Sequence, residues 1–276
     1  MASKLGIIAG LGDLPVNVAQ QALGLGRDIY VLRLDGFVEP KLDEFDGDIV
    51  GIGEIGKHIK LLKAAGCEEV VFAGIVKRPD FSKLKLDMRG TLLLPKVIAA
   101  ARKGDDALLR TLVGTLEKEG FKVRGAEDFN NGLLAPAGII AGGVPSEHLM
   151  EDLKRAAHVA SVIGVEDIGQ GCVVRDGLVV AVEAQEGTDA MLKRVASLPR
   201  TSVGGVLVKR PKPMQERRID LPTIGVNTIK AVSSAGLKGI GLEAGGALIL
   251  DIEQCKHTAD QLDVFLYGFP RDWGEV

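Results

Sequence analysis

The sequence predicts an α/β protein of two domains: an N-terminal, doubly wound, mostly parallel Rossmann-like domain and a second, mixed α/β domain. The chain has 276 residues, more than one compact domain usually holds. From Leu5 to about residue 120, apolar runs of strand length alternate with helical patterns, which is typical of a doubly wound sheet. The second half instead contains a strand–turn–strand signal at Asp176–Gly177, which indicates a separate sheet with hairpins.

The first domain begins with a buried strand, Leu5–Ala9, followed by the turn Gly10-Leu11-Gly12. A helix is predicted from Asp13 to about Leu23, because Asp13 suits an N-cap and Pro15 is tolerated in a first turn, where its missing N–H is not needed. The alternation continues with strands at 28–32, 48–52 and 69–73 and with helices at 55–65, 92–102 and 105–119. The run 69–73 is continuously apolar in its second half, as in a parallel sheet covered on both faces.

The character of the chain changes near Asn130, where turn-forming residues become frequent up to Val144-Pro145. We therefore assign residues 1–131 to the first domain, 132–148 to a linker and 149–276 to a C-terminal mixed α/β domain. In the second domain we expect a helix from about 146 to 163, the hairpin at Asp176–Gly177 and a helix after Thr188. Further strands are predicted at 205–208, 239–242, 247–250 and 264–267, and further helices at 227–235 and 251–260.

Composition excludes several functional classes. The formal net charge of −3 supplies no basic field, so no nucleic-acid partner is expected. The three cysteines are widely spaced without a C-x-x-C pair, which indicates free thiols rather than a disulfide framework or a zinc site. No apolar run approaches the roughly 20 residues of a membrane helix, and the N-terminal apolar stretch is too short for a signal peptide. We expect a cytoplasmic protein whose contact with a membrane is peripheral.

Two features of the first domain suit an anionic ligand. The turn Gly10-Leu11-Gly12 lies between a strand and a helix, where backbone N–H groups face a phosphate in nucleotide-binding folds. Pro15 replaces the third glycine of that motif and Asp13 would repel a phosphate, so a tight turn without a ligand is an equal alternative. Lys77-Arg78 follows the strand ending at Ala73, at the edge where such sheets bind ligands, although a solvated basic turn explains it as well.

Carboxylates gather at two predicted helix starts. Asp105-Asp106 opens a helix, and the second of these aspartates is a candidate for contact with a hard cation or a substrate, the alternative being an ordinary cap. Near the end of another strand, Glu186, Thr188 and Asp189 place two carboxylates and a hydroxyl around one turn. A simple helix cap with an exposed strand end is the alternative there.

The segment from Lys209 to Gly225 has the densest charge. Five cations fall within residues 209–218 of a proline-restrained loop, and Asp220 and Thr223 follow just before a helix. Cations neutralise a pyrophosphate, and a carboxylate orients water or holds Mg²⁺. A charged surface loop that ends in an ordinary cap explains the charges but not their concentration beside Asp220. The four histidines share no metal-binding spacing.

Seven stretches, in order along nearly the whole chain, resemble the LpxI-type UDP-2,3-diacylglucosamine pyrophosphatases of lipid A biosynthesis. They are GIIAGLGDLP (6–15), FAGIVKRP (72–79), GDD (104–106), DIGQ (167–170), VEAQEGTD (182–189), LVK (207–209) and DLPTIG (220–225). The resemblance implies hydrolysis of UDP-2,3-diacylglucosamine to UMP and 2,3-diacylglucosamine 1-phosphate (lipid X), with Mg²⁺ as cofactor. It also implies water attack on the sugar-side phosphorus and a substrate clamped between two domains.

The resemblance also implies roles for residues. Asp220 would be the essential carboxylate, with Lys209 as its catalytic partner. Substrate would be bound from the first domain by Gly10, Leu11, Gly12, Asp13, Lys77 and Arg78, and from the second by Gln170, Glu186, Thr188, Thr223 and Gly225. The candidate metal ligands are Asp105, Asp106 and Asp189. Pro211 and the extra basic residues of the loop depart from the family pattern, which puts lipid or loop contacts in doubt rather than Asp220.

The implied partner is a nucleotide-activated diacyl sugar, met at the cytoplasmic face of the inner membrane. Its acyl chains need an apolar groove, which we expect between the domains or at the face of a homodimer. Two alternatives stay open. One is a dinucleotide-dependent oxidoreductase, since Asp35 lies 23 residues after Gly12, near the spacing of a ribose-binding acid. The other is a non-catalytic module that binds a nucleotide-linked lipid.

Overall fold

The computed structural model describes residues 3–199 and 204–273. By their internal contacts these residues form two compact units. Unit 1 comprises the chain up to Asn131 together with Glu216–Ile219, and unit 2 comprises Gly132–Gln215 together with the chain from Asp220 onward. None of the described helices is long and apolar enough to span a bilayer.

Unit 1 contains a five-stranded sheet in the order β3-β2-β1-β4-β5. Every neighbouring pair in this sheet is parallel. The strands are β1 (Lys4–Ala9), β2 (Ile29–Leu34), β3 (Gly47–Val50), β4 (Cys67–Ala73) and β5 (Lys122–Arg124). This is the strand order of a Rossmann-like, doubly wound sheet. The predicted fold class of the first domain is therefore confirmed.

The helices of unit 1 cover the sheet, which explains why its central strands are mostly apolar. They are α1 (Asp13–Gly24), α2 (Ile55–Ala64), α3 (Met88–Ala101) and α4 (Asp105–Lys118), with short 3₁₀ turns at Pro40–Glu44, Phe81–Lys83 and Ala126–Asp128. On one face, Ile8 and Leu32 share a core with Ile59 of α2 and Leu116 of α4. Helix α1 contacts β1, β2 and β4.

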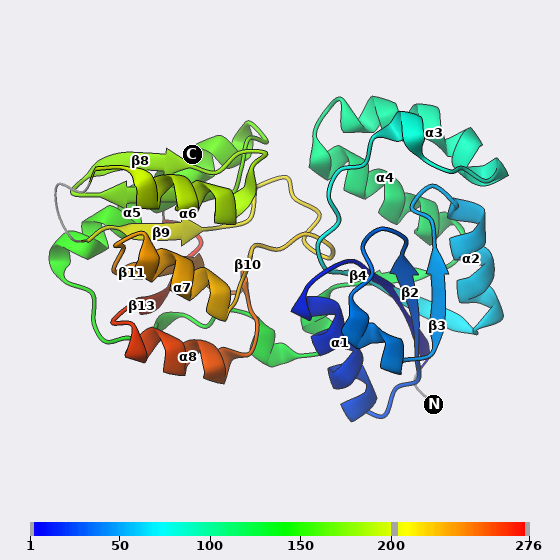
Figure 1. The fold of residues 1–276 in the computed structure, drawn as a ribbon, viewed down its shortest axis with the longest axis horizontal. Coiled ribbons are helices and arrows are strands. Elements are labelled where there is room, and N and C mark those ends of the chain that lie inside the picture. Colours follow the sequence, from blue (N-terminus) through cyan, green and yellow to red (C-terminus); the bar gives the residue numbers. More distant parts are fainter. Residues whose placement is uncertain (1–2, 200–203, 274–276) are drawn as a thin grey trace. The chain divides into compact units, whose positions relative to one another are not determined.

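Unit 2 contains a six-stranded mixed sheet in the order β6-β13-β11-β9-β7-β8 (Figure 1). The central strands β9, β11 and β13 are parallel, while β6, β7 and β8 pair antiparallel with their neighbours. The strands are β6 (Gly138–Ala141), β7 (Gly171–Arg175), β8 (Leu178–Val182), β9 (Val206–Lys209), β11 (Gly239–Glu243) and β13 (Phe265–Phe269). A separate parallel pair joins β10 (Thr223–Ile224) and β12 (Leu248–Ile249). The predicted mixed α/β fold is confirmed.

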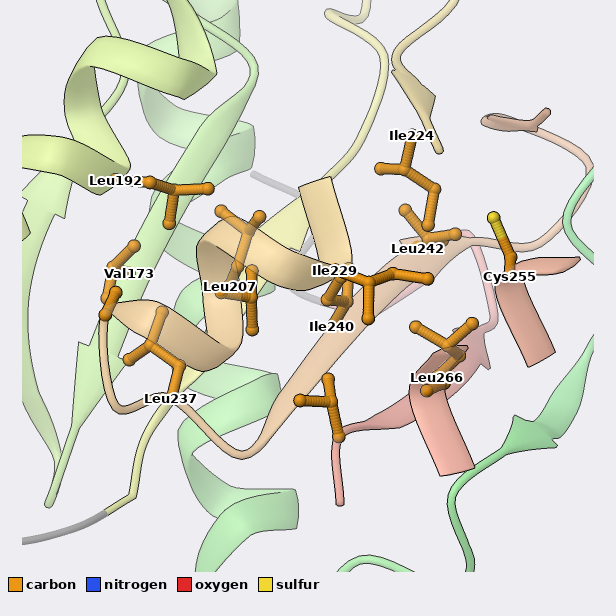
Figure 2. Packing of buried hydrophobic residues seen from close by; sticks show 14 of the residues in the cluster. Val173, Leu192, Leu207, Ile224, Ile229, Leu237, Ile240, Leu242, Cys255 and Leu266 are labelled. Atoms are coloured by element: carbon orange, nitrogen blue, oxygen red, sulfur yellow. The ribbon is translucent and has the colours of Figure 1, made fainter. Parts of the chain in front are cut away.

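Alternate side chains of the unit 2 strands enter two different cores. Val173, Leu207 and Ile240 pack with residues from the helices on one face, as Figure 2 shows. Their chain neighbours Cys172 and Val206 pack instead against the long helix on the other face. The helices are α5 (Glu147–Val165), which covers the second face, and α6 (Gly187–Ser197), α7 (Val226–Ser234) and α8 (Ile252–Gln261), which cover the first.

Two features of the chain path differ from the sequence-based expectation. The segment 132–148, predicted as a linker, contains β6, which pairs antiparallel with β13 and so is an edge strand of the unit 2 sheet. The segment Glu216–Ile219 belongs to unit 1. There the Glu216 N–H donates to Asp106 at 2.6 Å, Arg218 pairs with Glu117 at 2.7 Å, and Ile219 packs on the core.

Candidate functional site

Lys209 ends β9 and is a buried cation of unit 2. Its residue is only 5% exposed, and strand register places it opposite Gly171 of β7. Its Nζ donates one long hydrogen bond, of 3.5 Å, to the carbonyl oxygen of Thr223. Within the part of the chain that the structure describes, Lys209 forms no ion pair. Because buried charges are normally paired, this ammonium is suited to a ligand that brings negative charge.

Arg210, the next residue along the chain, is buried in a different way. Its guanidinium forms an ion pair with Glu243 at 3.1 Å, and both side chains are at most 5% exposed. It also donates to the carbonyl oxygens of Ala157, Arg271 and Trp273 at 3.3, 3.0 and 2.7 Å. These contacts join the end of β9 to α5 and to the C-terminal segment. Arg210 therefore has a structural role that its neighbour lacks.

The concentration of cations in the loop after β9 has a largely structural explanation. Lys212 pairs with Asp167 at 2.5 Å, and Arg218 pairs with Glu216 at 2.8 Å and with Glu117 at 2.7 Å. With the Arg210–Glu243 pair, three of the five cations are thus held by carboxylates of the protein. The charge density alone is not evidence for a ligand, whereas the buried position of Lys209 is.

Gln215 is a buried amide that sequence reasoning missed. It is 7% exposed and its Nε2 donates to the Asp220 carboxylate and, at 3.4 Å, to Oε1 of Gln170. Its own Oε1 accepts from the Lys212 N–H at 2.8 Å. The amide thereby links two residues that the sequence singled out separately. Its place in a proline-restrained loop was a signal, but nothing local identified its partners.

Asp220, Thr223 and Gly225 follow one another into α7. Asp220 is half-buried, and Thr223 donates its hydroxyl to the Leu221 carbonyl at 3.0 Å while its own carbonyl accepts from Lys209. Gly225 stands at the N-cap position of α7. Together with the Gln215 contacts, these bonds bring Lys209, Gln170, Asp220 and Thr223 into one hydrogen-bonded neighbourhood of unit 2.

The turn between β8 and α6 adds a buried carboxylate. Thr188 donates its hydroxyl to Oε1 of Glu183 at 2.9 Å, and Glu183 is 6% exposed. The other oxygen of Glu183 is buried and accepts no hydrogen bond from any described residue. A Cβ on Gly171, the residue opposite Lys209, would lie 2.4 Å from that oxygen, so a larger residue there would displace the Glu183 carboxylate. Glu183 lies within one of the seven stretches that resemble the family, but the sequence alone did not identify it as a site residue.

Glu186 and Asp189 lie on the exposed surface of the same turn. Glu186 pairs with Arg194 at 2.8 Å. Backbone N–H groups at the helix start, with Arg194 as a second cause, hold the pKa of this carboxyl below its ordinary value. Both residues are accessible, and neither joins the buried network around Thr188.

In unit 1, Gly10 and Gly12 of the first turn occupy their positions for different structural reasons. The Gly10 N–H donates to Ala73 at 2.9 Å, and Leu11 and Ile75 exchange backbone hydrogen bonds of 3.0 and 2.8 Å. A Cβ on Gly10 would lie 2.6 Å from the Ile75 carbonyl oxygen, so packing against the chain after β4 requires this glycine. Gly12 has a φ of +95° and open space around its Cβ position. Only Gly12 therefore leaves room for a ligand to approach the backbone.

The N-terminus of α1 is already surrounded by carboxylates. The Gly12 N–H donates to Glu39 at 3.2 Å, and Asp13 pairs with Lys41 at 2.9 Å on the surface. A phosphate at this helix end would face both negative charges. The geometry therefore favours contact with an uncharged part of a ligand.

The other predicted residues of unit 1 lie in the segment after β4 and at the start of α4. Arg78 pairs with Asp105 at 3.3 Å and donates to the Ala101 carbonyl at 2.6 Å, so it joins the end of α3 to the start of α4. Both oxygens of Asp106 accept hydrogen bonds, one from Arg110 at 2.7 Å and one from the Glu216 N–H at 2.6 Å. Lys77 is exposed.

The described residues hold no group of three or more His, Cys, Asp or Glu side chains arranged to bind a metal ion. Asp105 and Asp106 belong to unit 1 and have arginine partners, while Asp189 belongs to unit 2. Magnesium commonly keeps several waters and takes one or two carboxylates together with substrate phosphate oxygens. The carboxylates of each unit fit that mode better than a cage made by the protein alone.

The cysteines are not candidates for nucleophiles. All three are buried, and burial raises the pKa of the Cys67, Cys172 and Cys255 thiols to about 11, 12 and 11. Thiols with such pKa values are protonated at neutral pH and unreactive.

These features define a two-unit α/β protein with a buried lysine at a strand end that has no ion pair among the described residues. Residues 4–133 match the family model described as the LpxI N-terminal domain, and residues 136–267 match the LpxI C-terminal domain. The chain belongs to the LpxI family, as the seven sequence stretches predicted. It is 52% identical over 271 residues to a protein of Caulobacter vibrioides named UDP-2,3-diacylglucosamine pyrophosphatase LpxI, covering 96% of this chain and 97% of that relative.

Likeness to solved structures is much weaker. A CobK precorrin-6A reductase superposes with a TM-score of 0.35 at 12% identity, covering 98% of this chain and 88% of that one. An N5-carboxyaminoimidazole synthase from Aspergillus clavatus superposes with a TM-score of 0.23 at 15% identity, covering 67% and 42%. At these TM-scores neither likeness supports a conclusion.

Proposed function

We propose that this chain hydrolyses the pyrophosphate of UDP-2,3-diacylglucosamine to UMP and 2,3-diacylglucosamine 1-phosphate, a step of lipid A biosynthesis. The name of the Caulobacter relative supports the substrate. The structural observation that carries the proposal is Lys209, a cation 5% exposed with one hydrogen bond of 3.5 Å and no ion pair among the described residues. A pyrophosphate supplies the negative charge that this lysine lacks.

Lys209 would act mainly on the transition state. During hydrolysis, negative charge develops on the phosphoryl oxygens and on the departing UMP. A fixed ammonium in a site with little water stabilises that charge more strongly than a solvated one, because the local dielectric is lower. Its stem is held in β9 between β7 and β11, so its position changes little when substrate binds.

Asp220 would orient the attacking water or hold the cation. The donation from Gln215 fixes one carboxylate oxygen in direction. The Mg²⁺ that we propose as cofactor would supply charge neutralisation at the pyrophosphate. Asp220 would be the carboxylate that holds it, because Gln215 fixes its direction within unit 2, the unit that contains Lys209. Asp105, Asp106 and Asp189 remain weaker candidates, because the first two already have arginine partners.

The remaining predicted residues would bind the parts of the substrate that do not react. We propose that the two units clamp the substrate, with Gln170, Glu186, Thr188, Thr223 and Gly225 contributing from unit 2. In unit 1, open space at Gly12 suits an uncharged group. Ile75 and Val76, 65% and 41% exposed, adjoin the same turn and are apolar enough to contact an acyl chain. Lys77 and Arg78 would assist at the phosphates.

The test is release of UMP from UDP-2,3-diacylglucosamine by the purified protein with Mg²⁺. Replacing Asp220 with Ala should lower turnover about 10²–10⁴-fold while substrate binding is retained. Asp263→Ala is the matched control, because that carboxylate is 83% exposed and pairs only with Lys238 among the described residues. Its activity should equal that of the wild type.

Absence of UMP at saturating enzyme would refute the proposal. A protein that binds NAD(H) tightly and does not bind UMP would indicate the oxidoreductase alternative. An Asp220→Ala variant with full function would indicate a binding module rather than an enzyme.

A further inference from the structure

Helix α3 has an apolar stripe on the side that faces solvent. Met88 is 82% exposed and Leu92 is 77% exposed, and Pro95 and Ala99 are also exposed. These four positions are spaced by four, three and four residues, so they lie along one face of the helix. An outward face of a surface helix is normally polar.

The stripe is not a core-facing side left without a packing partner, because another side of α3 already packs against the protein. Gly90 of that side faces Gly53, where an added Cβ would lie 2.0 Å from the Gly53 carbonyl oxygen. Ala100 and Ala101 are 9% and 5% exposed, and the helix contacts α2 and α4. This packing fixes the orientation of α3, so its apolar stripe remains exposed to solvent.

The charged residues of α3 itself and of the two positions that follow it are all positive. Residues 88–103 contain four cations and no acid, although the whole chain has a net charge of −3. Arg89 pairs with Glu119. The other three cations form no ion pair with any residue that the structure describes: they are Lys96, Arg102 and Lys103, all exposed. A net positive, apolar helix face thus occurs on an acidic protein.

We propose that this face of α3 docks on an anionic lipid surface. This rests on the proposed function, since a diacylated substrate resides in a bilayer. Interfacial helices insert apolar side chains at the boundary between headgroups and acyl chains, and keep cations at the level of the headgroups. Met88 and Leu92 supply the first feature, and Lys96, Arg102 and Lys103 supply the second. The attraction is local, because salt screens it within about 10 Å.

A second copy of the chain fits the same face less well. A two-fold interface brings identical patches together, so a patch with three cations of one copy would face the same positively charged patch of the other. Like charges opposed across an interface are unfavourable. An anionic lipid headgroup has the complementary sign, and this is why we assign the surface to lipid.

The test uses the full chain and vesicles without substrate. We expect it to co-sediment with vesicles of phosphatidylcholine containing phosphatidylglycerol, much less with phosphatidylcholine alone, and less as salt is raised. The variant Met88→Asp/Leu92→Asp should lower the partition coefficient about tenfold or more. Leu178→Asp is the matched control, because Leu178 is 71% exposed on unit 2 and should leave binding unchanged.

Three outcomes would overturn the inference. One is a wild-type protein that ignores anionic vesicles, or a double variant that binds them as the wild type does. Another is a variant that changes the molar mass in light scattering, which would assign the stripe to a second copy. A third is a folded variant that loses UMP release from detergent-dispersed substrate, which would assign the stripe to substrate binding. Vesicle binding requires no turnover, so its failure and a failure of the proposed hydrolysis are separate results.

Discussion

In unit 1 the charged side chains beside the Gly10-Leu11-Gly12 turn are exposed, whereas in unit 2 the two cations at the end of β9 are buried. The Asp13 and Lys41 side chains are 67% and 64% exposed, while the Lys209 and Arg210 residues are 5% and 4% exposed. Exposed ion pairs contribute little to stability, and their loss has small effects. A buried charge is unfavourable unless a protein group or a ligand compensates it. We therefore expect replacements of the buried charges in unit 2 to have larger effects than replacements of the exposed charges in unit 1.

A second contrast lies inside unit 2, between adjacent residues. Arg210 has Glu243 as its partner at 3.1 Å, and Lys209 has no ionic partner among the described residues. The first arrangement stabilises the fold. The second leaves a buried charge without an ionic partner among the residues that the structure describes. The two residues should therefore respond in opposite ways to the same replacement.

The largest effect is expected for Lys209→Met. Removing the ammonium should lower the turnover number about 10²–10³-fold, because transition-state charge loses a fixed partner. Stability should stay equal or rise by about 1 kcal/mol, because an unpaired buried charge is replaced by an apolar chain of similar length. UMP release and urea unfolding measure the two quantities. An active, destabilised variant would contradict the assignment.

Arg210→Met should instead destabilise the protein by about 3–5 kcal/mol, because Glu243 loses its guanidinium partner in a buried setting. Thermal or urea unfolding measures this. Lys238→Met serves as the control, since it breaks an ion pair whose Asp263 partner is 83% exposed and should change stability by less than about 1 kcal/mol. Equal effects of the two replacements would remove the distinction between buried and exposed pairs.

Replacements in the glycine turn of unit 1 test whether this turn contacts the substrate. Gly10→Ala should destabilise by about 1–3 kcal/mol, because its Cβ would lie 2.6 Å from the Ile75 carbonyl oxygen. Gly12→Ala meets no neighbouring atom but places alanine at a φ of +95° and a ψ of −178°, a region essentially confined to glycine, which costs about 1–3 kcal/mol. If the turn contacts substrate, Gly12→Ala raises KM at nearly unchanged kcat. An unchanged KM would remove Gly12 from the site.

The smallest effect concerns two histidines with opposite pKa shifts. Burial lowers the pKa of His58 in unit 1, with a hydrogen bond to the Gly51 carbonyl opposing it, and the carboxylate of Asp176 raises the pKa of His148 in unit 2. The stability contribution of His58 is complete above about pH 6.5, the unfolded pKa, and falls as pH drops toward its folded pKa. That of His148 is complete below about pH 6.5 and falls as pH rises through its folded pKa.

Nuclear magnetic resonance titration of the histidine rings measures this difference. His58 should titrate at lower pH than His148. In the variant Asp176→Asn, His148 should move toward its ordinary pKa while His58 stays unchanged. The reverse order of titration would contradict the burial argument.

Local patterns were sufficient to predict much of this fold. The apolar run of β1 and its glycine turn, the alternation that follows, and the Asp176–Gly177 hairpin are all decided by residues close in the chain. Strands β5, β6 and β10 were not predicted. They contain three, four and two residues, and they are strands because of the neighbours with which they pair rather than because of their own composition. Seven ordered motifs sufficed to recognise the family.

The sequence by itself determined that cations, Asp220 and Gln170 lie near strand ends, because turn chemistry and strand period are local properties. Only the tertiary structure decided which of these cations have carboxylate partners among the residues that it describes. Lys212 finds Asp167 across 45 residues and the Glu216 N–H finds Asp106 across 110, and such pairings depend on which elements pack together. Ion pairing and burial are properties of that packing, so they separate Lys209 from Arg210 where the sequence shows two adjacent basic residues.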